Sequence, residues 1–263
     1  MIFVTGDIHG DPERFNTDYF ADQLELSRDD YMIICGDFGL LWDEEENPME
    51  RVLLNWLEDK NYTTLFIDGN HENFDRLNKI QVEEWHGGHV HKVRDHVIHL
   101  MRGEIFDLNG KSVYAFGGAR SHDINGLATS TALKRDYTAG ILQKDDPRLE
   151  EKLKILDITY RHTRIEGKTW WRAEMPTRDE MDRGLKNLSN HDNKVDMIIS
   201  HDGPSSDVAV LGGGFLRLDP LNRYLEIVKR TAKYENWYFG HHHENQQIAA
   251  NDYVIYENIE RIY

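Results

Sequence analysis

Five short glycine-containing motifs hold the residues of this chain that are best suited to chemistry. They are GDIHG (6–10), GDFG (36–39), GNHE (69–72), SHDGP (200–204) and GHHHEN (240–245). The first three follow the apolar runs IFV, YMIIC and TLFI, which are typical of buried strands. Glycines beside the polar residues let the backbone turn sharply where a strand becomes a loop.

The motifs supply three kinds of metal donor: carboxylate, imidazole and amide oxygen. The donors are Asp7, His9, Asp37, Asn70, His201 and the histidines of GHHHEN. Such a mixed set suits Mn, Fe or Zn, whereas an all-oxygen set suits Mg or Ca. A single Asp-x-His motif usually lies in an ordinary loop. Five strand ends that each carry residues of metal-binding types, in one chain, predict a metal site.

The run GHHHEN places three histidines in a row, His241, His242 and His243. In an extended segment, residues i and i+2 share a face. We therefore expect His241 and His243 to face the metals and His242 to point away.

Strands and helices alternate along much of the chain. Residues 11–26 and 47–60 are helix-like, the second with Asn47 as N-cap and Pro48 at the first helical position. Strand–helix–strand repetition predicts parallel strands with right-handed crossovers. In such sheets ligands bind beyond the carboxyl ends of the strands, where the five motifs fall.

The middle of the chain has a different character. Residues 97–118 are typical of short strands, with Asn109-Gly110 as a hairpin turn. Residues 121–168 are polar and mixed, with a helical patch at 146–156. We interpret this segment as an insertion over the sheet within one domain that spans residues 1–263. The tail, 246–263, reads as antiparallel strands.

Composition limits the partners. With 47 acidic and 31 basic residues, the formal charge is -16. Because Lys and Arg supply most non-specific affinity for nucleic acid, we expect no long duplex partner. A small phosphate-ester or nucleotide-like substrate remains compatible with this charge. The sequence does not indicate an oligomeric state.

Features of the chain favour a cytoplasmic location. The single cysteine, Cys35, lies in an apolar run, which predicts a buried thiol and excludes an intrachain disulfide. No secretory signal is visible, and no apolar run approaches the ~20 residues that cross a bilayer. We expect no membrane association.

The order of the motifs resembles that of the calcineurin-like metallophosphoesterases, D-x-H, GD, GNH[ED], [GS]H and GHxH. The resemblance extends from Asp7 to His243. The segments FGGARSHDI (116–124) and WWRAEMP (170–176) are similar to a group of uncharacterised bacterial and phage phosphoesterases. The resemblance implies an α/β fold, a four-layer α/β/β/α sandwich of two mixed sheets flanked by helices, with a metal pair at one edge.

The resemblance also assigns roles by position. It implies two divalent ions, Mn first, with Fe, Zn, Ni or Mg as alternatives. The first ion would be held by Asp7, His9 and His243, and the second by Asn70, His201 and His241. Asp37 would bridge them, since ions about 3.5–4 Å apart need a shared carboxylate.

This resemblance predicts a binuclear metal-dependent phosphoesterase that hydrolyses mono- or diesters. A metal-bridging hydroxide would attack phosphorus. His71 would bind a phosphate oxygen or protonate the leaving group.

One departure concerns the serine/threonine protein phosphatases, which read GDxxDRG where this chain reads GDFGLLW. Leu40 replaces the aspartate that orients the catalytic histidine there, and Leu41 replaces the arginine that grips phosphate. The protein-phosphatase alternative is therefore weakened. The carboxylate partner of His71 stays open, with Asp43 and Glu72 as candidates, although we expect both to be solvated.

Another cation should then contact the phosphate. Arg120, with His122 beside it, follows a Gly-Gly-Ala turn that resembles an anion cradle. Residues 160–172 interleave Arg161, Arg164, Lys168 and Arg172 with Tyr160, Trp170 and Trp171. This patch is able to stack a base, but we favour packing of the tryptophans beneath the insertion.

Two other functions stay open. A single-strand nuclease is supported only by the 160–172 patch and is opposed by the net charge. A non-catalytic metal-binding scaffold is opposed by the complete donor set. The five histidines 86, 89, 91, 96 and 99 fit no ligand position, and we expect them on the surface or in hairpins.

Overall fold

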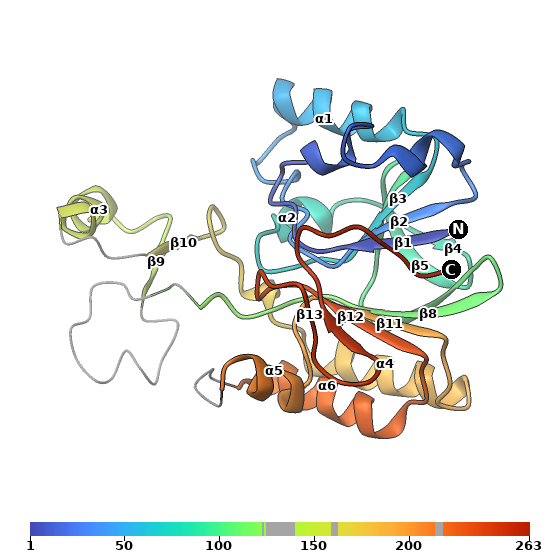
Figure 1. Cartoon of the computed structure of the whole chain (residues 1–263). Helices are drawn as coiled ribbons and strands as arrows, with labels where there is room; N and C mark the ends of the chain where they lie inside the picture. Colours follow the sequence, from blue (N-terminus) through green and yellow to red (C-terminus); the bar gives the residue numbers. More distant parts are fainter. Residues whose placement is uncertain (123, 125–139, 159–162, 214–217) are drawn as a thin grey trace.

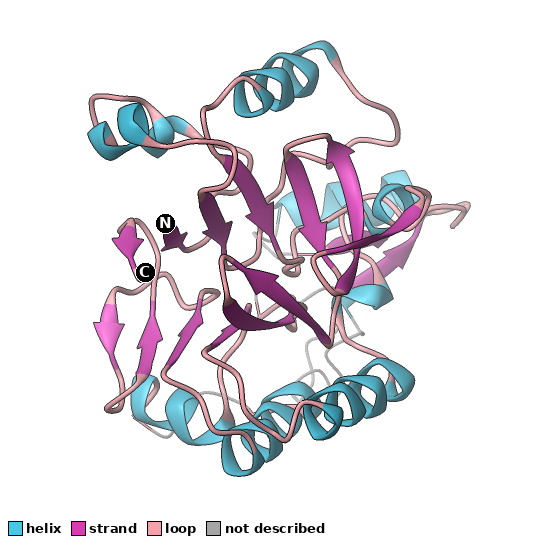
Figure 2. Ribbon diagram, turned by 90° about the vertical axis from the view of Figure 1, so that its right-hand side faces the viewer, coloured by secondary structure: helices cyan, strands magenta, loops and turns pink. Residues whose placement is uncertain are grey.

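Two mixed β-sheets lie face to face between helices (Figures 1 and 2). The computed structural model describes residues 1–122, 124, 140–158, 163–213 and 218–263. The strand order is β15-β1-β2-β3-β6-β5-β4 in the first sheet and β13-β14-β12-β11-β8-β7 in the second. This architecture confirms the predicted α/β sandwich with four layers.

The first sheet has a parallel centre with antiparallel edges. Its parallel strands are β1 (Ile2–Thr5), β2 (Tyr31–Ile34), β3 (Thr63–Phe66) and β6 (Val97–Leu100). Its antiparallel strands are β4 (Val82–Trp85), β5 (Gly88–Arg94) and β15 (Glu260–Arg261).

The second sheet follows the same plan. Its parallel strands are β8 (Lys111–Phe116), β11 (Met197–Ser200), β12 (Asn236–Phe239) and β14 (Asp252–Val254). Its antiparallel edges are β7 (Glu104–Leu108) and β13 (Gln246–Gln247). Asn109 and Gly110 both have positive φ between β7 and β8, as the predicted hairpin requires. The tail is antiparallel only in part, because β14 joins β12 in parallel.

Helices cover the outer faces of the sandwich. They are α1 (Pro48–Glu58) over the first sheet, α4 (Arg178–Asn190) and α6 (Pro220–Thr231) over the second, and the shorter α2 (Phe74–Leu77) and α5 (Ser205–Leu211). The side chain of Asn47 caps α1 by accepting from the backbone N–H of Glu50, as predicted. Within the described residues, no helix is long and apolar enough to cross a membrane.

Alternate residues of each central strand enter different core layers. In β2, Tyr31 and Ile33 pack between the sheets, whereas Met32 and Ile34 pack with Leu54 of α1. A third cluster joins the outer face of the second sheet to α4 and α6. Because both faces of these strands are buried, they read as continuous apolar runs.

Residues 11–26 do not form the predicted helix. They form two 3₁₀ turns, η1 (Glu13–Phe15) and η2 (Ala21–Glu25), and Asn16 between them is extended. Polar residues 16–18 are of types that compete with helical hydrogen bonds. The core takes Phe15 and Phe20, while Tyr19 and Leu24 are exposed.

The described parts of the insertion lie beyond one edge of the two large sheets rather than over a sheet face (Figure 1). They are α3 (Leu149–Ile158) and a parallel ribbon of β9 (Ile141–Gln143) and β10 (Arg164–Glu166). Tyr160 and Arg161 of the basic-aromatic patch lie outside the described residues. Trp170 and Trp171 are buried, at 1% and 5% exposure, which agrees with packing rather than base stacking.

His91 and His99 lie in the β5–β6 hairpin, one of the two placements predicted, but both are buried. They lie opposite each other in β5 and β6, and their rings are parallel with centroids 5.3 Å apart. His99 also contacts the carboxylate of Asp68 at 3.1 Å. Pairing of β5 to the sheet centre carries this histidine pair into the interior.

Candidate metal centre

The predicted ligands gather where the carboxyl ends of the two sheets meet. Asp7, Asp37 and Asn70 follow β1, β2 and β3 of the first sheet, and His201 and His241 follow β11 and β12 of the second. Contacts between these residues cross from one sheet to the other, as described below. Parallel strands of both sheets therefore place the site where their carboxyl ends converge.

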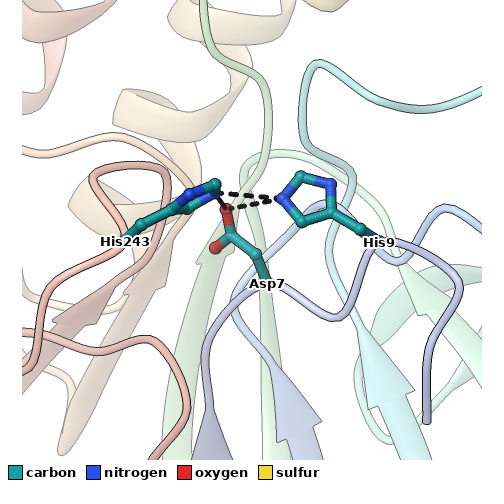
Figure 3. Close-up of side chains that lie close together, drawn as sticks. All are labelled: Asp7, His9 and His243. Carbon is teal, nitrogen blue, oxygen red and sulfur yellow. Dashed lines mark hydrogen bonds and ion pairs between the residues drawn. The ribbon is translucent and has the colours of Figure 1, made fainter.

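Asp7, His9 and His243 form one tight group (Figure 3). The Nε2 atoms of His9 and His243 are 3.0 Å apart, and they lie 3.8 and 3.2 Å from Asp7 Oδ2. One donor atom from each residue lies within 4.8 Å of the others. This is the trio that the family resemblance assigned to the first ion.

The carboxylate of Asp7 provides a test of whether a cation fits. Its Oδ1 accepts a hydrogen bond from the backbone N–H of His241 at 3.0 Å. Its Oδ2 is buried and accepts no hydrogen bond of good geometry within the described part of the chain, and the nearby imidazoles of His243 and His9 make only ion-pair contacts with it. A buried anionic oxygen without a donor is costly, and a cation between the two imidazoles would satisfy it.

Asp37 lies between the groups of donors. Its Oδ1 accepts from the backbone N–H of His71 at 2.8 Å and lies 3.3 Å from His201 Nε2. Its Oδ2 lies 3.8 Å from His9 Nδ1. Asp37 therefore has one oxygen toward each side of the centre, which suits a shared ligand.

The orientation of His201 is fixed from behind. Its Nδ1 donates to the carbonyl of Cys35 at 2.8 Å, so its Nε2 is directed toward Asn70 Oδ1 and Asp37 Oδ1, each 3.3 Å away. Such a bond to the far nitrogen selects the tautomer that binds a metal. Cys35 is itself buried, as predicted.

The charges of the site favour a cation. Burial lowers the pKa of His201, but Asp37 and Asp7 outweigh it and raise that pKa to about 10. Burial likewise opposes ionisation of Asp37, but the charges of His201 and His71 hold its pKa well below the ordinary value. The buried carboxylates thus draw positive charge to this position, and a divalent ion would supply it.

Three glycines make room for these ligands. A Cβ on Gly36 would lie 2.1 Å from His201 Nδ1, one on Gly69 2.0 Å from Asp37 Oδ1, and one on Gly240 2.2 Å from Asp7 Oδ1. Any side chain at these positions would displace a ligand. The glycines of the sequence motifs are therefore explained by close approach as well as by turning.

The backbone of the site is locally strained. His9, Asp37, His241 and His243 all have positive φ, between 45° and 65°. They are half of the eight non-glycine residues with positive φ in the described ranges. Such strain gathers at functional sites.

The extended geometry expected for GHHHEN was therefore wrong, although His242 does point away. Its Nε2 lies 3.0 Å from Asp202 Oδ1, a carboxylate outside the predicted donor set. Two left-handed residues, not strand alternation, set this pattern.

His241 is less closely placed than the other predicted ligands. Its ring centroid lies 5.0 Å from that of His201, and its Nε2 lies 3.4 Å from His122 Nε2. It belongs to none of the three-residue donor groups found among the described residues. His122 accordingly lies beside the second predicted ion position.

His71 lies half-buried at the rim and stacks on Trp42. Neither suggested carboxylate bonds to it in the described contacts. Glu72 is buried rather than solvated, and it accepts from the backbone N–H groups of Phe38 and Gly39. Asp43 accepts from Asn47 Nδ2 at 2.6 Å.

The sequence analysis missed two supports of the site. Trp42, which contacts His71, stands in GDFGLLW, where attention fell on the leucines; its place directly after a donor motif was the available signal. Ser121 contacts Asn70 Nδ2 at 3.4 Å and donates to the buried Glu174 at 2.7 Å. No sequence signal links residues 121 and 174.

Arg120 does not lie on the surface. Its side chain is buried, and its Nε lies 4.0 Å from Asp219 Oδ2. Contact of Arg120 or His122 with a phosphate stays a prediction.

Fold and site together define a metal-binding α/β sandwich whose donors come from the ends of both sheets. A family model for calcineurin-like phosphoesterases matches residues 1–245, and the chain belongs to this family. Its members depend on divalent metals and hydrolyse phosphoric esters, in agreement with the donor groups described above. A comparison with curated proteins yielded no match.

Proposed function

We propose that this protein is a binuclear metal-dependent phosphoesterase that hydrolyses small phosphate mono- or diesters. The observation that carries the proposal is Asp37, whose two oxygens face His201 on one side and His9 on the other. Asp7, His9 and His243 would hold one ion, and Asn70, His201 and His241 the other. We expect Mn first. Two such ions supply charge neutralisation for the phosphate and lower the pKa of a water molecule.

The chain positions its own proton donor beside this centre. The ring of His71 lies 5.2 Å from that of His9, and its backbone N–H is held by Asp37. A half-buried imidazole at the rim is able to protonate a departing alkoxide. His71 is the catalytic residue in this proposal.

Two rival functions lose support. Leu40 and Leu41, at the positions of the protein-phosphatase aspartate and arginine, are buried in the core at 5% and 3% exposure. Trp170 and Trp171 are buried, so these two side chains of the 160–172 patch do not support base stacking by a nuclease.

The test is a panel of phosphate mono- and diesters, with Mn-loaded wild-type protein and the Asp37→Ala protein as blank. We expect turnover by the wild type only, and Asp37→Ala should lose both turnover and bound metal. His71→Ala should keep its metal and lose about 10²–10⁴-fold in turnover, the usual contribution of a positioned acid. Metal is measured by elemental analysis and folding by circular dichroism. Inertness of metal-loaded wild-type protein across the panel would refute the proposal.

A further inference from the structure

A pocket of about 400 Å³ opens directly beside His71. His9 and His71 belong to its lining, so it is continuous with the metal centre. Its other walls include Leu40, Trp42, Met49 and Leu53. Met49 lies on the first turn of α1 and is 67% exposed at the rim. A pocket with a partly apolar lining therefore adjoins the proposed proton donor.

The charge around this pocket is negative. Asp43 lines it and is exposed, and the exposed Glu44 and Glu45 follow directly in the chain. Glu50 also belongs to the lining, but Arg76 neutralises it through two hydrogen bonds of 2.6 and 2.8 Å. The described residues of the lining include no lysine or arginine. An anion that extends into this pocket, away from the metal centre, would approach Asp43, and no lysine or arginine of the described lining would offset that charge.

We propose that this pocket holds the leaving group of the ester and selects an aromatic or apolar alcohol without negative charge. The inference rests on the proposed function. In the hydrolysis, a water oxygen bonds to phosphorus and releases a proton to solvent, the ester P–O bond breaks, and His71 gives a proton to the departing oxygen and is reprotonated from solvent. That oxygen must lie within hydrogen-bond reach of His71, so the organic group attached to it extends into the space beside His71.

The walls specify the class of alcohol. Trp42 offers a large apolar side chain, and Leu40, Leu53 and Met49 complete the apolar part of the lining. A volume of about 400 Å³ is in the range of small-ligand pockets. A strand of nucleotides leaving on this side would bring further phosphates toward residues 43–45, which are acidic and exposed. The pocket therefore favours single small esters over oligonucleotides.

A matched pair of substrates tests the charge selectivity. 4-Carbamoylphenyl phosphate and 4-carboxyphenyl phosphate have nearly the same shape and differ in the charge of the leaving group. We expect kcat/KM to be about tenfold higher for the neutral ester, because like charges a few ångströms apart near a protein surface repel appreciably.

Variants at the rim place the effect in this pocket. Met49→Lys should reduce the preference to about threefold or less, since it puts a cation at the exposed rim. Met49→Gln controls for the change of side chain, and Ile227→Lys, at an exposed position of α6, controls for net charge. Both controls should keep the wild-type preference. Equal kcat/KM for the two esters, or the same change in Ile227→Lys as in Met49→Lys, would overturn the pocket assignment while leaving the phosphoesterase intact.

A binding measurement separates this inference from the proposed function. Saturation-transfer NMR on the wild-type protein should detect 4-hydroxybenzamide and show a much weaker signal for 4-hydroxybenzoate. Met49→Lys should raise the second signal, and Met49→Gln should not. If no ester turns over, the proposed function fails and these spectra alone decide the pocket. Absence of any difference between the two alcohols would then refute it.

Discussion

The indole ring of Trp42 stacks on the imidazole ring of His71, with ring centroids 6.0 Å apart and planes inclined by 30°. Trp171 meets Trp42 edge to face at 5.6 Å and donates its Nε1–H to Asp75 at 3.0 Å. The proposed proton donor is thus oriented by an aromatic ring where related phosphatases use a carboxylate. Trp171 belongs to the segment that returns from the insertion, so this segment contributes to the proposed active site.

We expect Trp42→Ala to lower kcat about tenfold for esters of poor leaving groups, a part of what a positioned acid contributes. The loss should be much smaller for 4-nitrophenyl esters, because their leaving group departs without a proton. Trp42→Phe keeps an aromatic face and should stay close to wild type. Steady-state kinetics on both ester types measure this contrast. An equal loss for both would mean that Trp42 does not act through His71.

Gly69→Ala should disrupt the centre, because the added Cβ would lie 2.0 Å from Asp37 Oδ1 and 2.4 Å from its backbone nitrogen. We expect loss of bound metal and about 1–3 kcal/mol of unfolding free energy, as is usual for overpacking. Elemental analysis and urea unfolding give the two quantities. Gly110→Asn is the control, since that position is open and asparagine tolerates positive φ. Full metal content in Gly69→Ala would contradict the shared position of Asp37.

His242→Ala and His243→Ala should have opposite profiles. His242→Ala leaves the buried Asp202 without its imidazole partner, so we expect a loss of about 1–3 kcal/mol in stability and near-normal metal content. His243→Ala removes an exposed side chain, so it should cost little stability and much metal. Metal content and urea unfolding of both variants provide the comparison. If His242→Ala lost as much metal as His243→Ala, the division of the histidine run would be wrong.

Stability should depend on pH through Glu174. Burial raises its pKa from 4.5 to about 7, although two hydrogen bonds from Ser121 act to lower that pKa. The folded state therefore binds this proton more tightly than the unfolded state. The resulting stabilisation is complete below pH 4.5 and is lost as pH rises through about 7.

As pH rises from 5 to 8, the unfolding free energy of Glu174→Gln should increase relative to that of the wild type. The increase should reach about 3 kcal/mol, at 1.36 kcal/mol per pKa unit. Urea unfolding at both pH values, with EDTA present to remove metal effects, measures the difference. Glu84→Gln, on the exposed edge strand β4, should show no such trend. A difference between Glu174→Gln and wild type that does not vary with pH would exclude this role.

The sequence by itself predicted parallel strands with the donor motifs at their ends, and its resemblance to a known family supplied the four-layer sandwich and the roles of the donors. Continuous apolar runs such as 31–35 predict strands that are buried on both faces, because such strands show no alternation of polar and apolar residues. The donors Asp7, Asp37 and Asn70 come directly after such strands, so their common edge followed from parallel pairing.

Only the tertiary structure decided what surrounds those donors. Ser121 and Glu174 meet across 53 residues, and Trp42 meets Trp171 although neither stands in a periodic pattern. Backbone conformation was equally hidden, since the left-handed His241 and His243 lie in a run that alternation describes as extended. Local periodicity predicts strands and helices, whereas contacts between distant segments depend on how the chain packs in three dimensions. Trp42 and the pocket beside His71 depend on parallel pairing within the first sheet, because Trp42 follows β2 and His71 follows its neighbour β3.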